Sequence, residues 1–424
     1  MRSVDGWQSN ILGEVCEFIG GNGFPEQLQG RKDGDYPFIK VSDMELPGNK
    51  KMIVQANNWI DRKTQTNEAF NICPEFSVVF AKVGAALLLN RRRIITRPTC
   101  IDNNMMAAVP SGIQPLFLYY VLSNIDFADL VQSGAVPSIN QRQISGISFD
   151  MPKLESEQAK IAEVLSTVDR AIEQTESLIA KQQRIKTGLM HDLLTRGIDE
   201  HGRLRSEETH QFKDSPLGRI PVEWEVKRLF ELVDIAEGQK DPTKEPYRDW
   251  PLVAPDHVES GTGLLLSLIT AREQRAISGK YEFAPGDIVY SKIRPYLRKA
   301  VLVDFVGLCS ADMYPMRPKG KTTSEFILLT ILGERFSKYA ESVSERSGFP
   351  KINRSELASF VVATPLAAEQ KRMASFSNKF AKSFELEKRL LTKLRSLKTA
   401  LMQDLLTGKV RVTPLLDSTE VMSE

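Results

Sequence analysis

Two stretches of the chain gather basic side chains of the kind that bind phosphate and nucleic-acid bases. The first runs from Lys82 to Arg97 and contains five cations and no acidic residue. The second, residues 272–299, has seven Lys and Arg against three acids, a net charge of 7 − 3 = +4, with tyrosines at 281, 290 and 296. Lysine neutralises phosphate, arginine can pair with guanine through two hydrogen bonds, and aromatic rings stack on bases. Both stretches favour contact with DNA; the alternative is an ordinary solvated loop.

Motifs for catalysis or cofactor binding are missing. Gly320-Lys-Thr lacks the glycine five residues earlier that a Walker loop requires. Asp241-Pro-Thr-Lys lacks the second proline and the aromatic residue of an amino-methyltransferase motif, and no acid-x-Lys sequence follows Pro255-Asp256 within thirty residues, as a nuclease motif would require. The histidines, at 191, 201, 210 and 257, lack the spacing of metal ligands. We therefore expect no catalytic residue and no metal site.

Length and composition indicate a multidomain globular protein. The 424 residues are 42% hydrophobic and 26% charged, enough for two or three cores. The net charge of +2 excludes a polycation and an acidic disordered chain. The four cysteines are scattered without CxxC spacing, which fits a reducing cytosol. Because no apolar stretch resembles a signal segment or a membrane span, we expect a cytoplasmic protein without membrane contact.

A stretch of 41 residues occurs twice, 212 positions apart. Residues 157–197 and 369–409 align without a gap and are identical at 14 of 41 positions. Eight apolar pairs fall on the same offset, mostly at steps of three, four and seven, as in a helix seam that packs on another helix. They are Ile161, Val164, Val168, Ile172, Leu178, Ile185, Leu189 and Leu193 in the first copy, and Met373, Phe376, Phe380, Phe384, Leu390, Leu397, Leu401 and Leu405 in the second. The repeat predicts two long helices.

The segments before the two helices are duplicated in layout. Each opens near a tryptophan, Trp7 or Trp224, and continues with a strand-like stretch (76–84, 283–293), a short helical stretch (115–125, 324–336) and a related turn, SGAVPSIN (133–140) or SGFPKIN (347–353). We predict globular domains at 1–153 and 221–365, long helices at 154–198 and 366–410, a linker at 199–220 and a tail at 411–424. The expected fold is α/β (α+β), with a pseudo-twofold internal repeat.

Two long helices with matching seams can pack antiparallel and form a coiled-coil spacer between two globular domains. A helix over 157–194 spans roughly 55 Å, or about 16 base pairs of DNA. This geometry fits a two-part DNA site. It also fits a bivalent non-enzymatic scaffold with a coiled-coil ruler, which would show no preference for DNA sequence. A self-sufficient methyltransferase or nuclease would require the motifs that are missing.

The chain resembles the specificity (S) subunits of Type I restriction-modification systems over nearly its whole length. The resemblance rests on the helix ends LMHDLLTRG and LMQDLLTGK and on their entries MPKLESEQAKIAEVL and TPLAAEQKRMASF. It rests also on the bridge FKDSPLGRIPVEWEV (212–226) and on PGDIVYSKIRPYLRKAVLV (285–303). One departure is FAKVGAALL, the first domain's counterpart of SKIRPYL, which lacks the Arg-Pro-Tyr.

The resemblance implies a non-catalytic subunit with two target recognition domains, each reading one half of an asymmetric, interrupted sequence in double-stranded DNA. The helices would set the gap and dock two modification (M) subunits, and restriction (R) subunits would join them. It implies no cofactor on this chain, with S-adenosylmethionine, ATP and Mg on the partner subunits. The candidate DNA contacts are Lys40, Ser42, Lys82, Arg91, Arg92, Arg93 and Asn140 in the first domain, and Lys292, Arg294, Tyr296, Arg298, Lys351, Asn353 and Arg354 in the second.

Overall fold

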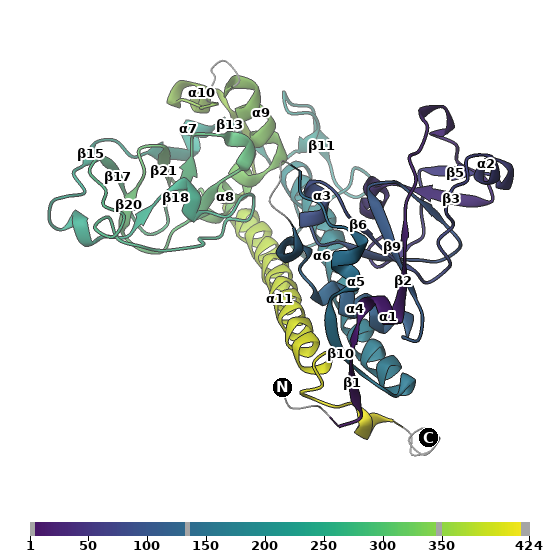
Figure 1. Cartoon of the computed structure of the whole chain (residues 1–424). Coiled ribbons are helices and arrows are strands. Elements are labelled where there is room, and N and C mark those ends of the chain that lie inside the picture. Colours follow the sequence, from purple (N-terminus) through teal and green to yellow (C-terminus); the bar gives the residue numbers. More distant parts are fainter. Residues whose placement is uncertain (1–4, 132–135, 345–349, 417–424) are drawn as a thin grey trace. The chain divides into compact units, whose positions relative to one another are not determined.

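The structure is a computed structural model and describes residues 5–131, 136–344 and 350–416; the side chains of residues 378–382 lie outside this description. The chain divides into two compact units (Figure 1). Unit 1 comprises Met1–Thr175 with Leu390–Glu424, and unit 2 comprises Glu176–Arg389. The two long helices, α6 (Glu155–Thr195) and α11 (Ala367–Leu405), each contribute one part to either unit. Among the described residues, no helix has both the length and the apolar character needed to span a membrane.

Unit 1 is built around a five-stranded sheet of order β2-β9-β6-β7-β4. The central strand β6 reads Val-Val-Phe-Ala, and all four residues are buried, as a continuous apolar run predicts for a strand covered on both faces. A three-stranded sheet, β5-β3-β8, and the pair β1-β10 complete the strands. Their bounds are β1 Trp7–Ile11, β2 Cys16–Gly20, β3 Tyr36–Ile39, β4 Met52–Ile53, β5 Asn58–Ile60, β6 Val78–Ala81, β7 Arg92–Ile95, β8 Cys100–Ile101, β9 Met105–Pro110 and β10 Ser148–Pro152.

Short helices cover this sheet and connect its strands. The predicted helical stretch 115–125 is confirmed as α4 (Pro115–Asn124), which begins with proline at its first turn and is capped by Gln114, whose side chain accepts a hydrogen bond from the Phe117 amide at 2.6 Å. The other helices are α1 Leu12–Val15, α2 Arg62–Asn67, α3 Ala85–Leu88 and α5 Gln141–Ser145, with 3₁₀ turns η1 Glu26–Leu28, η2 Val41–Glu45, η3 Phe127–Leu130 and, in the tail, η7 Thr413–Leu415.

Unit 2 has two four-stranded sheets, β14-β21-β18-β19 and β15-β17-β20-β16, and two strand pairs, β13-β22 and β11-β12. The central strand β18 is buried at every position, as β6 is in unit 1. The bounds are β11 Phe212–Lys213, β12 Ile220–Pro221, β13 Glu225–Arg228, β14 Val233–Ile235, β15 Gln239–Lys240, β16 Leu252–Val253, β17 Lys280–Phe283, β18 Ile288–Ser291, β19 Ala300–Leu302, β20 Gly307–Cys309, β21 Met313–Pro318 and β22 Val361–Thr364.

The predicted helical stretch 324–336 is two helices, α8 (Ser324–Leu332) and α9 (Glu334–Ser344). Gly333 separates them because its backbone is extended, with ψ 150°, and ends the hydrogen bonding of α8. A Cβ atom there would lie 2.7 Å from Leu194 Cδ1, so a larger residue would require the Leu194 side chain to shift. The remaining helical elements are α7 Leu229–Leu232, α10 Arg354–Ser359, and 3₁₀ turns η4 Tyr247–Asp249, η5 Pro255–His257 and η6 Pro295–Leu297.

The two units repeat the same order of elements, which confirms the predicted internal repeat and the mixed helix-and-sheet class. A strand that pairs with the last strand before a long helix opens each unit (β1 with β10, β13 with β22), and a single-turn helix follows it. Next comes an edge strand of the main sheet, paired in the same way (β2 with β9, β14 with β21). Residues 133–135 and 347–349 of the predicted matching turns lie outside the described residues.

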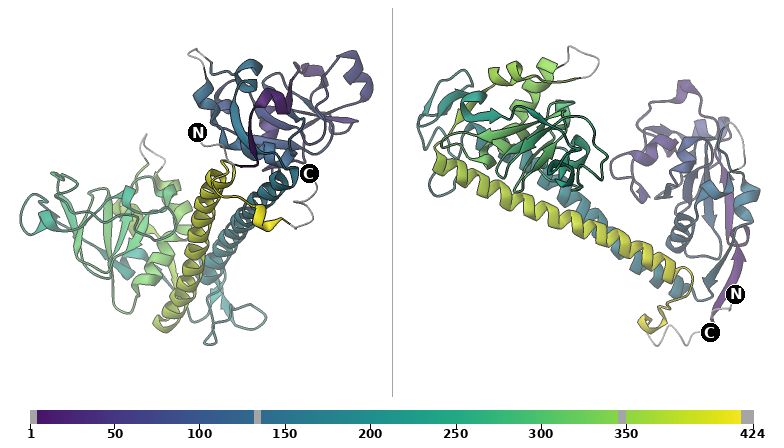
Figure 2. Two further views of the ribbon diagram at one scale, coloured as in Figure 1. Left: turned by 60° about the horizontal axis from the view of Figure 1, so that its bottom comes forward. Right: turned by 90° about the vertical axis from the view of Figure 1, so that its left-hand side faces the viewer.

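The long helices pack against each other within each unit (Figure 2). In unit 1, Ile161 and Leu165 of α6 share a core with Met402 and Leu405 of α11. In unit 2, Leu193 and Met373 share the other core. Further along, Asp169 pairs with Lys398 in unit 1, and Met190 contacts Ser377 in unit 2. In each unit, residue numbers thus fall on α11 as they rise on α6, so the helices run antiparallel there.

Candidate nucleic-acid interface

Lys82 and Lys292, two of the predicted contacts, occupy equivalent positions. Each directly follows the central strand of its sheet, β6 or β18. The Lys82 amide donates to the Asn104 carbonyl at 2.8 Å, and the Lys292 amide donates to that of Asp312 at 2.9 Å. The carbonyl of each lysine accepts from an isoleucine amide, Ile139 or Ile352, at 3.0 Å. One backbone framework thus positions both lysines, and its two isoleucines belong to the related turns SGAVPSIN and SGFPKIN.

Lys292 lies in a cluster of cations around one aromatic ring. Its Nζ is 5.0 Å from the Tyr314 ring centroid, and the Arg354 guanidinium is 5.5 Å from the same centroid. Burial, followed by the charge of Lys351, lowers the pKa of Lys292, while Asp312 opposes this shift. A partly desolvated cation beside other cations is stabilised by an incoming anion, and phosphate is such an anion.

Arg354 is held at the edge of the main sheet of unit 2. Its guanidinium donates to the Ile235 carbonyl at 3.3 Å and to the Ala236 carbonyl at 2.7 Å, and it forms an ion pair with Glu237 at 3.0 Å. Lys351, by contrast, is exposed. Arg354 therefore shapes the cluster, whereas Lys351 and Lys292 are the side chains available to a ligand.

In unit 1, Lys82 lies beside the end of β2. Its Nζ would be 3.8 Å from a Cβ atom at Gly20. At Gly21 a Cβ atom would lie 2.0 Å from the Asp102 carbonyl oxygen, so glycine is required for this close approach. Lys40 Nζ is 5.6 Å from the Phe24 ring, and Ser42 is exposed in η2. Gly21 thus serves the shape of this loop.

The arginine run 91–93 is divided by the fold. Arg92 is 3% exposed, its guanidinium lies 3.6 Å from the Phe127 ring centroid, and burial lowers its pKa to about 9. Arg93 donates to the carbonyls of Met44 at 3.0 Å and Asn49, and Arg91 pairs with Glu45. Because β7 places the side chain of Arg92 in the core and commits that of Arg93 to carbonyls, these two side chains pack the domain.

The second basic stretch is also divided. Arg294 and Arg298 flank η6, both with positive φ, 48° and 47°, and Arg294 and Tyr296 are exposed. Arg298 lines a small pocket with Gly261, Lys186 and His191. Arg298 is therefore turned toward helix α6, away from the role that sequence spacing had suggested.

The predicted contacts Asn140 and Asn353 are N-caps of equivalent helices. The Asn140 side chain accepts from the Gln143 amide and that of Asn353 from the Glu356 amide, both at 3.0 Å. In return, the backbone amides of Asn140 and Asn353 donate to side-chain oxygens of Gln143 and Glu356, at 2.9 and 2.8 Å. These capping boxes fix the segments that follow the two lysines.

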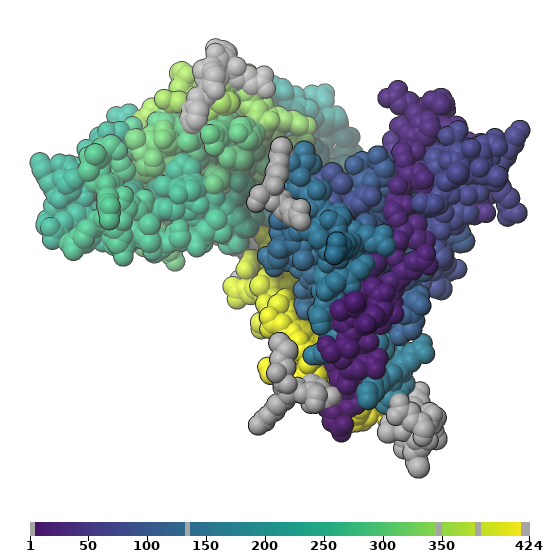
Figure 3. Space-filling view, in the orientation of Figure 1, coloured from purple at the N-terminus to yellow at the C-terminus, as the bar shows by residue number. Residues whose placement is uncertain are grey.

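The predicted seam is buried near its outer ends and at Phe384. Ile161, Leu193, Met373 and Leu405 are at most 3% exposed, whereas exposed fractions of 40–47% are found for Leu178, Ile185, Phe376, Leu390 and Leu397. Val164, Val168, Ile172, Leu189 and Leu401 are half-buried, and Phe384 is 9% exposed. The side chain of Phe380 lies outside the described residues. Part of α11 is visible at the surface in Figure 3.

A repeated Glu-Gln pair at the start of each long helix has a structural role that sequence reasoning missed. Gln158 accepts from the Gln114 amide and Gln370 from the Thr323 amide, both at 2.9 Å, so each glutamine fastens the N-terminus of α4 or α8. The preceding glutamates are buried and paired with arginines from distant segments: Glu157 with Arg411 at 2.6 Å, and Glu369 with Arg205. Both Glu-Gln pairs fall on the 212-residue offset of the repeat, and this repetition could have identified them from the sequence.

The described residues contain no group of three or more His, Cys, Asp or Glu side chains that could hold a metal ion. The four cysteines are buried and unpaired, and burial raises the pKa of Cys73 to about 12. A thiol in that state is a poor nucleophile.

Comparison with known proteins identifies relatives of one kind. A family model described as the Type I restriction modification DNA specificity domain matches residues 4–182 and again residues 221–396. The specificity subunit of the Type I restriction enzyme EcoDI from Escherichia coli is 29% identical over 383 residues, covering 86% of this chain and 79% of that one. The MjaVIII specificity subunit of Methanocaldococcus jannaschii is 26% identical over 436 residues, covering 98% and 95%.

Solved structures share the fold. The S subunit of a Type I restriction-modification system from M. genitalium has a TM-score of 0.58 at 12% identity, covering 94% of this chain and 96% of that one. A structure from work on assembly and conformational transition of the type I R-M system also has a TM-score of 0.58, at 16% identity, covering 97% and 100%.

Proposed function

The chain belongs to the Type I restriction-modification DNA specificity family, as a specificity subunit for a two-part DNA target. On this premise, we propose that Lys82 and Lys292 mark its two DNA-reading surfaces. The proposal rests on the equivalent positions of these two lysines: the same backbone hydrogen bonds present a lysine at the end of the central strand of each domain. Exposed Lys351 and Arg294 extend the surface in unit 2, and Lys40 and Ser42 extend it in unit 1. Because different residues surround Lys82 and Lys292, the two surfaces suit two different half-sites of the DNA.

The long helices act in this proposal as an antiparallel coiled-coil spacer. Its support is that α6 and α11 pack antiparallel inside each unit, at Asp169 with Lys398 in unit 1 and at Met190 with Ser377 in unit 2. A pair of helices of about 40 residues spans roughly 60 Å. A stiff spacer of this length would fix the gap between the half-sites.

The exposed apolar residues of the helices fit the docking of two M subunits. Leu178, Ile185, Leu390 and Leu397 are 40–47% exposed, whereas Ile161 and Met373 of the same helices are buried. Apolar side chains in this pattern favour a protein partner over water. R subunits would join the M subunits, which bring S-adenosylmethionine; ATP and Mg also belong to the partners, and this chain supplies recognition without catalysis.

The test is adenine methylation in a methylation-free host that produces the chain with its M subunit. We expect one two-part motif with a fixed gap. Lys292→Ala should weaken binding of the assembled complex to that motif by about 1–3 kcal/mol. It should also reduce the slope of log K against the logarithm of the salt concentration by about one. Lys63→Ala, which removes the same charge at an exposed position of unit 1, is the control.

Two results would contradict the proposal. An intact complex that methylates no two-part motif would favour the scaffold alternative. Unchanged affinity and salt dependence in Lys292→Ala would remove this lysine from the DNA-reading surface.

A further inference from the structure

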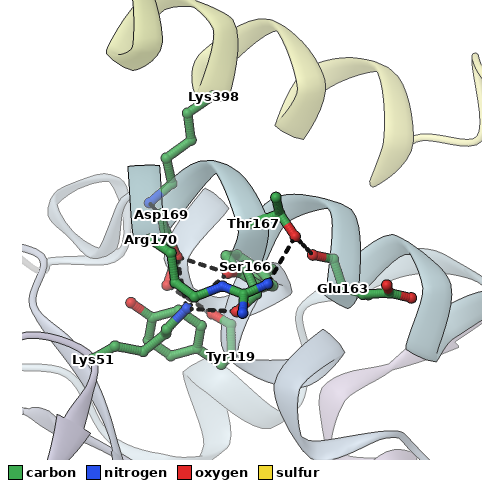
Figure 4. A network of polar contacts seen from close by, with 10 residues as sticks. Lys51, Tyr119, Glu163, Ser166, Thr167, Asp169, Arg170 and Lys398 are labelled. Carbon is green, nitrogen blue, oxygen red and sulfur yellow. Dashed lines mark hydrogen bonds and ion pairs between the residues drawn. The ribbon is translucent and has the colours of Figure 1, made fainter. Parts of the chain in front are cut away.

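Each globular domain is fastened to the long helices by an ion network, and the two networks differ in polarity. In unit 1 the domain supplies the cation and a helix supplies the acid. Lys51 Nζ donates to Asp169 Oδ2 at 3.1 Å and to Ser166 Oγ at 3.0 Å (Figure 4). Lys398 of α11 contacts the other oxygen of Asp169 at 2.7 Å. Asp169 thus joins the domain to both helices.

The unit 1 network is well shielded from water. The side chains of Lys51 and Asp169 are 14% and 8% exposed, and the fully buried Tyr120 donates to Asp169 at 2.7 Å. Burial raises the pKa of Asp169, but hydrogen bonds from Lys398 and Tyr120 and the charges of both lysines outweigh it, so the pKa lies below its ordinary value. The carboxylate is therefore held charged inside the contact.

In unit 2 the domain supplies the acid and the helices supply the cations. Glu259 pairs with Lys388 of α11 at 2.8 Å. Burial, then the charges of Lys388 and Arg298, lowers the pKa of Lys186 of α6, while Glu259 opposes this shift. Glu259 follows η5 and Lys51 follows η2, so these two charged residues come from corresponding segments of their domains.

The repeat offset shows which helix positions differ. Lys186 and Lys398 are equivalent, 212 positions apart. The position equivalent to Asp169 is Ala381, and the position equivalent to Lys388 is Glu176. The helix position that receives Lys51 is therefore acidic where its counterpart is neutral, and the position that receives Glu259 is basic where its counterpart is acidic.

We propose that this opposite polarity matches each domain to its own end of the helices, Lys51 to the acidic set and Glu259 to the basic set, so that the domains cannot exchange places. An exchanged first domain would bring Lys51 to Lys186 and Lys388 without a helix acid, and an exchanged second domain would bring Glu259 to Asp169 and Glu176. Partly buried like charges oppose such docking. This charge matching also fixes the order of the two half-sites in the DNA and the gap between them, a consequence that rests on the proposed function.

The experiment gives each domain the charge of the other. Lys51→Glu and Glu259→Lys are prepared separately in the full chain, assembled with M subunits, and titrated with target DNA of native gap and of a gap one base pair longer. We expect affinity for the native gap to fall about tenfold and the preference for that gap to shrink, because the domain is held less firmly. Lys63→Glu and Glu223→Lys, both exposed, are charge-matched controls that should behave as wild type.

Paired reversal separates charge matching from general damage. Lys51→Glu with Asp169→Lys, and Glu259→Lys with Lys388→Glu, should return affinity and gap preference to within about threefold of wild type. If a single reversal prevents assembly, its paired reversal must restore it. Single reversals that bind as wild type, or pairs that restore nothing, overturn the matching. A wild-type complex without a two-part target contradicts the proposed function instead.

Discussion

At the scale of single residues, the buried ion pair of unit 2 connects three segments that are far apart in sequence. Glu369, 3% exposed, accepts from Arg205, from the Ile198 amide at 3.0 Å and from Trp224 Nε1 at 3.1 Å. Arg205 belongs to the stretch that sequence composition had marked as a linker. The stretch is tied to the helix start because a buried carboxylate needs a partner for its charge.

Glu369→Gln removes that charge while keeping the shape of the side chain. It leaves Arg205 buried without a counter-ion, and the cost of breaking a buried pair in this way is about 3–5 kcal/mol. Hydrogen exchange should therefore accelerate for the backbone of residues 220–235 in unit 2. Glu155→Gln, at an exposed position on the first turn of α6, is the control and should leave exchange unchanged. Equal protection in Glu369→Gln and wild type would contradict the structural role of the pair.

At the scale of elements, the contact of the first domain with the helices depends on a carboxylate whose pKa is lowered. Such a group stabilises the folded state fully above its unfolded pKa, and this contribution is lost as pH falls through the folded value. Melting of the wild-type complex should thus weaken between about pH 5 and pH 3 by more than melting of Asp169→Asn. The variant should melt lower at pH 7. Parallel pH profiles would show that Asp169 contributes nothing to this dependence.

Sequence periodicity predicted the elements better than their contacts. The long helices, β6, β18 and α4 followed from apolar spacing, because spacing determines which face of an element is apolar. The break at Gly333 was missed since an apolar run does not show where the backbone leaves the helical conformation. Exposure at Leu178 and Leu390 was missed for a similar reason: periodicity identifies an apolar stripe, whereas only the fold shows what covers it.

The candidate site was predictable to the extent that it is repeated. Lys82 and Lys292 could be found from matching strands and matching turns, and the structure places them in one framework. The roles of Arg92, Asn140 and Asn353 could not, because packing on Phe127 and helix capping involve partners that a charge run does not reveal. Lys51 and Asp169 lie 118 positions apart, so no local pattern joins them.

At the scale of the whole molecule, the division into two units bears on how the two lysines act. Lys82 and Lys292 lie in different units, each with its own core and its own hydrogen-bonded framework. Mutations that share no partners usually have additive free energies, within about 0.5 kcal/mol. Lys82→Ala with Lys292→Ala should therefore weaken DNA binding by the sum of the two single effects.

Methylation of variant targets gives the corresponding assignment of half-sites. Lys82→Ala should relax or weaken reading of one half of the motif only, and Lys292→Ala of the other half only, because each lysine is presented by one domain. The measurement is methylation of targets altered in one half at a time, with the assembled complex at fixed salt, since phosphate contacts depend on ionic strength. If one substitution changed recognition of both halves, the two domains would be coupled through the helices. The description of two independent recognition domains on a stiff spacer would then be wrong.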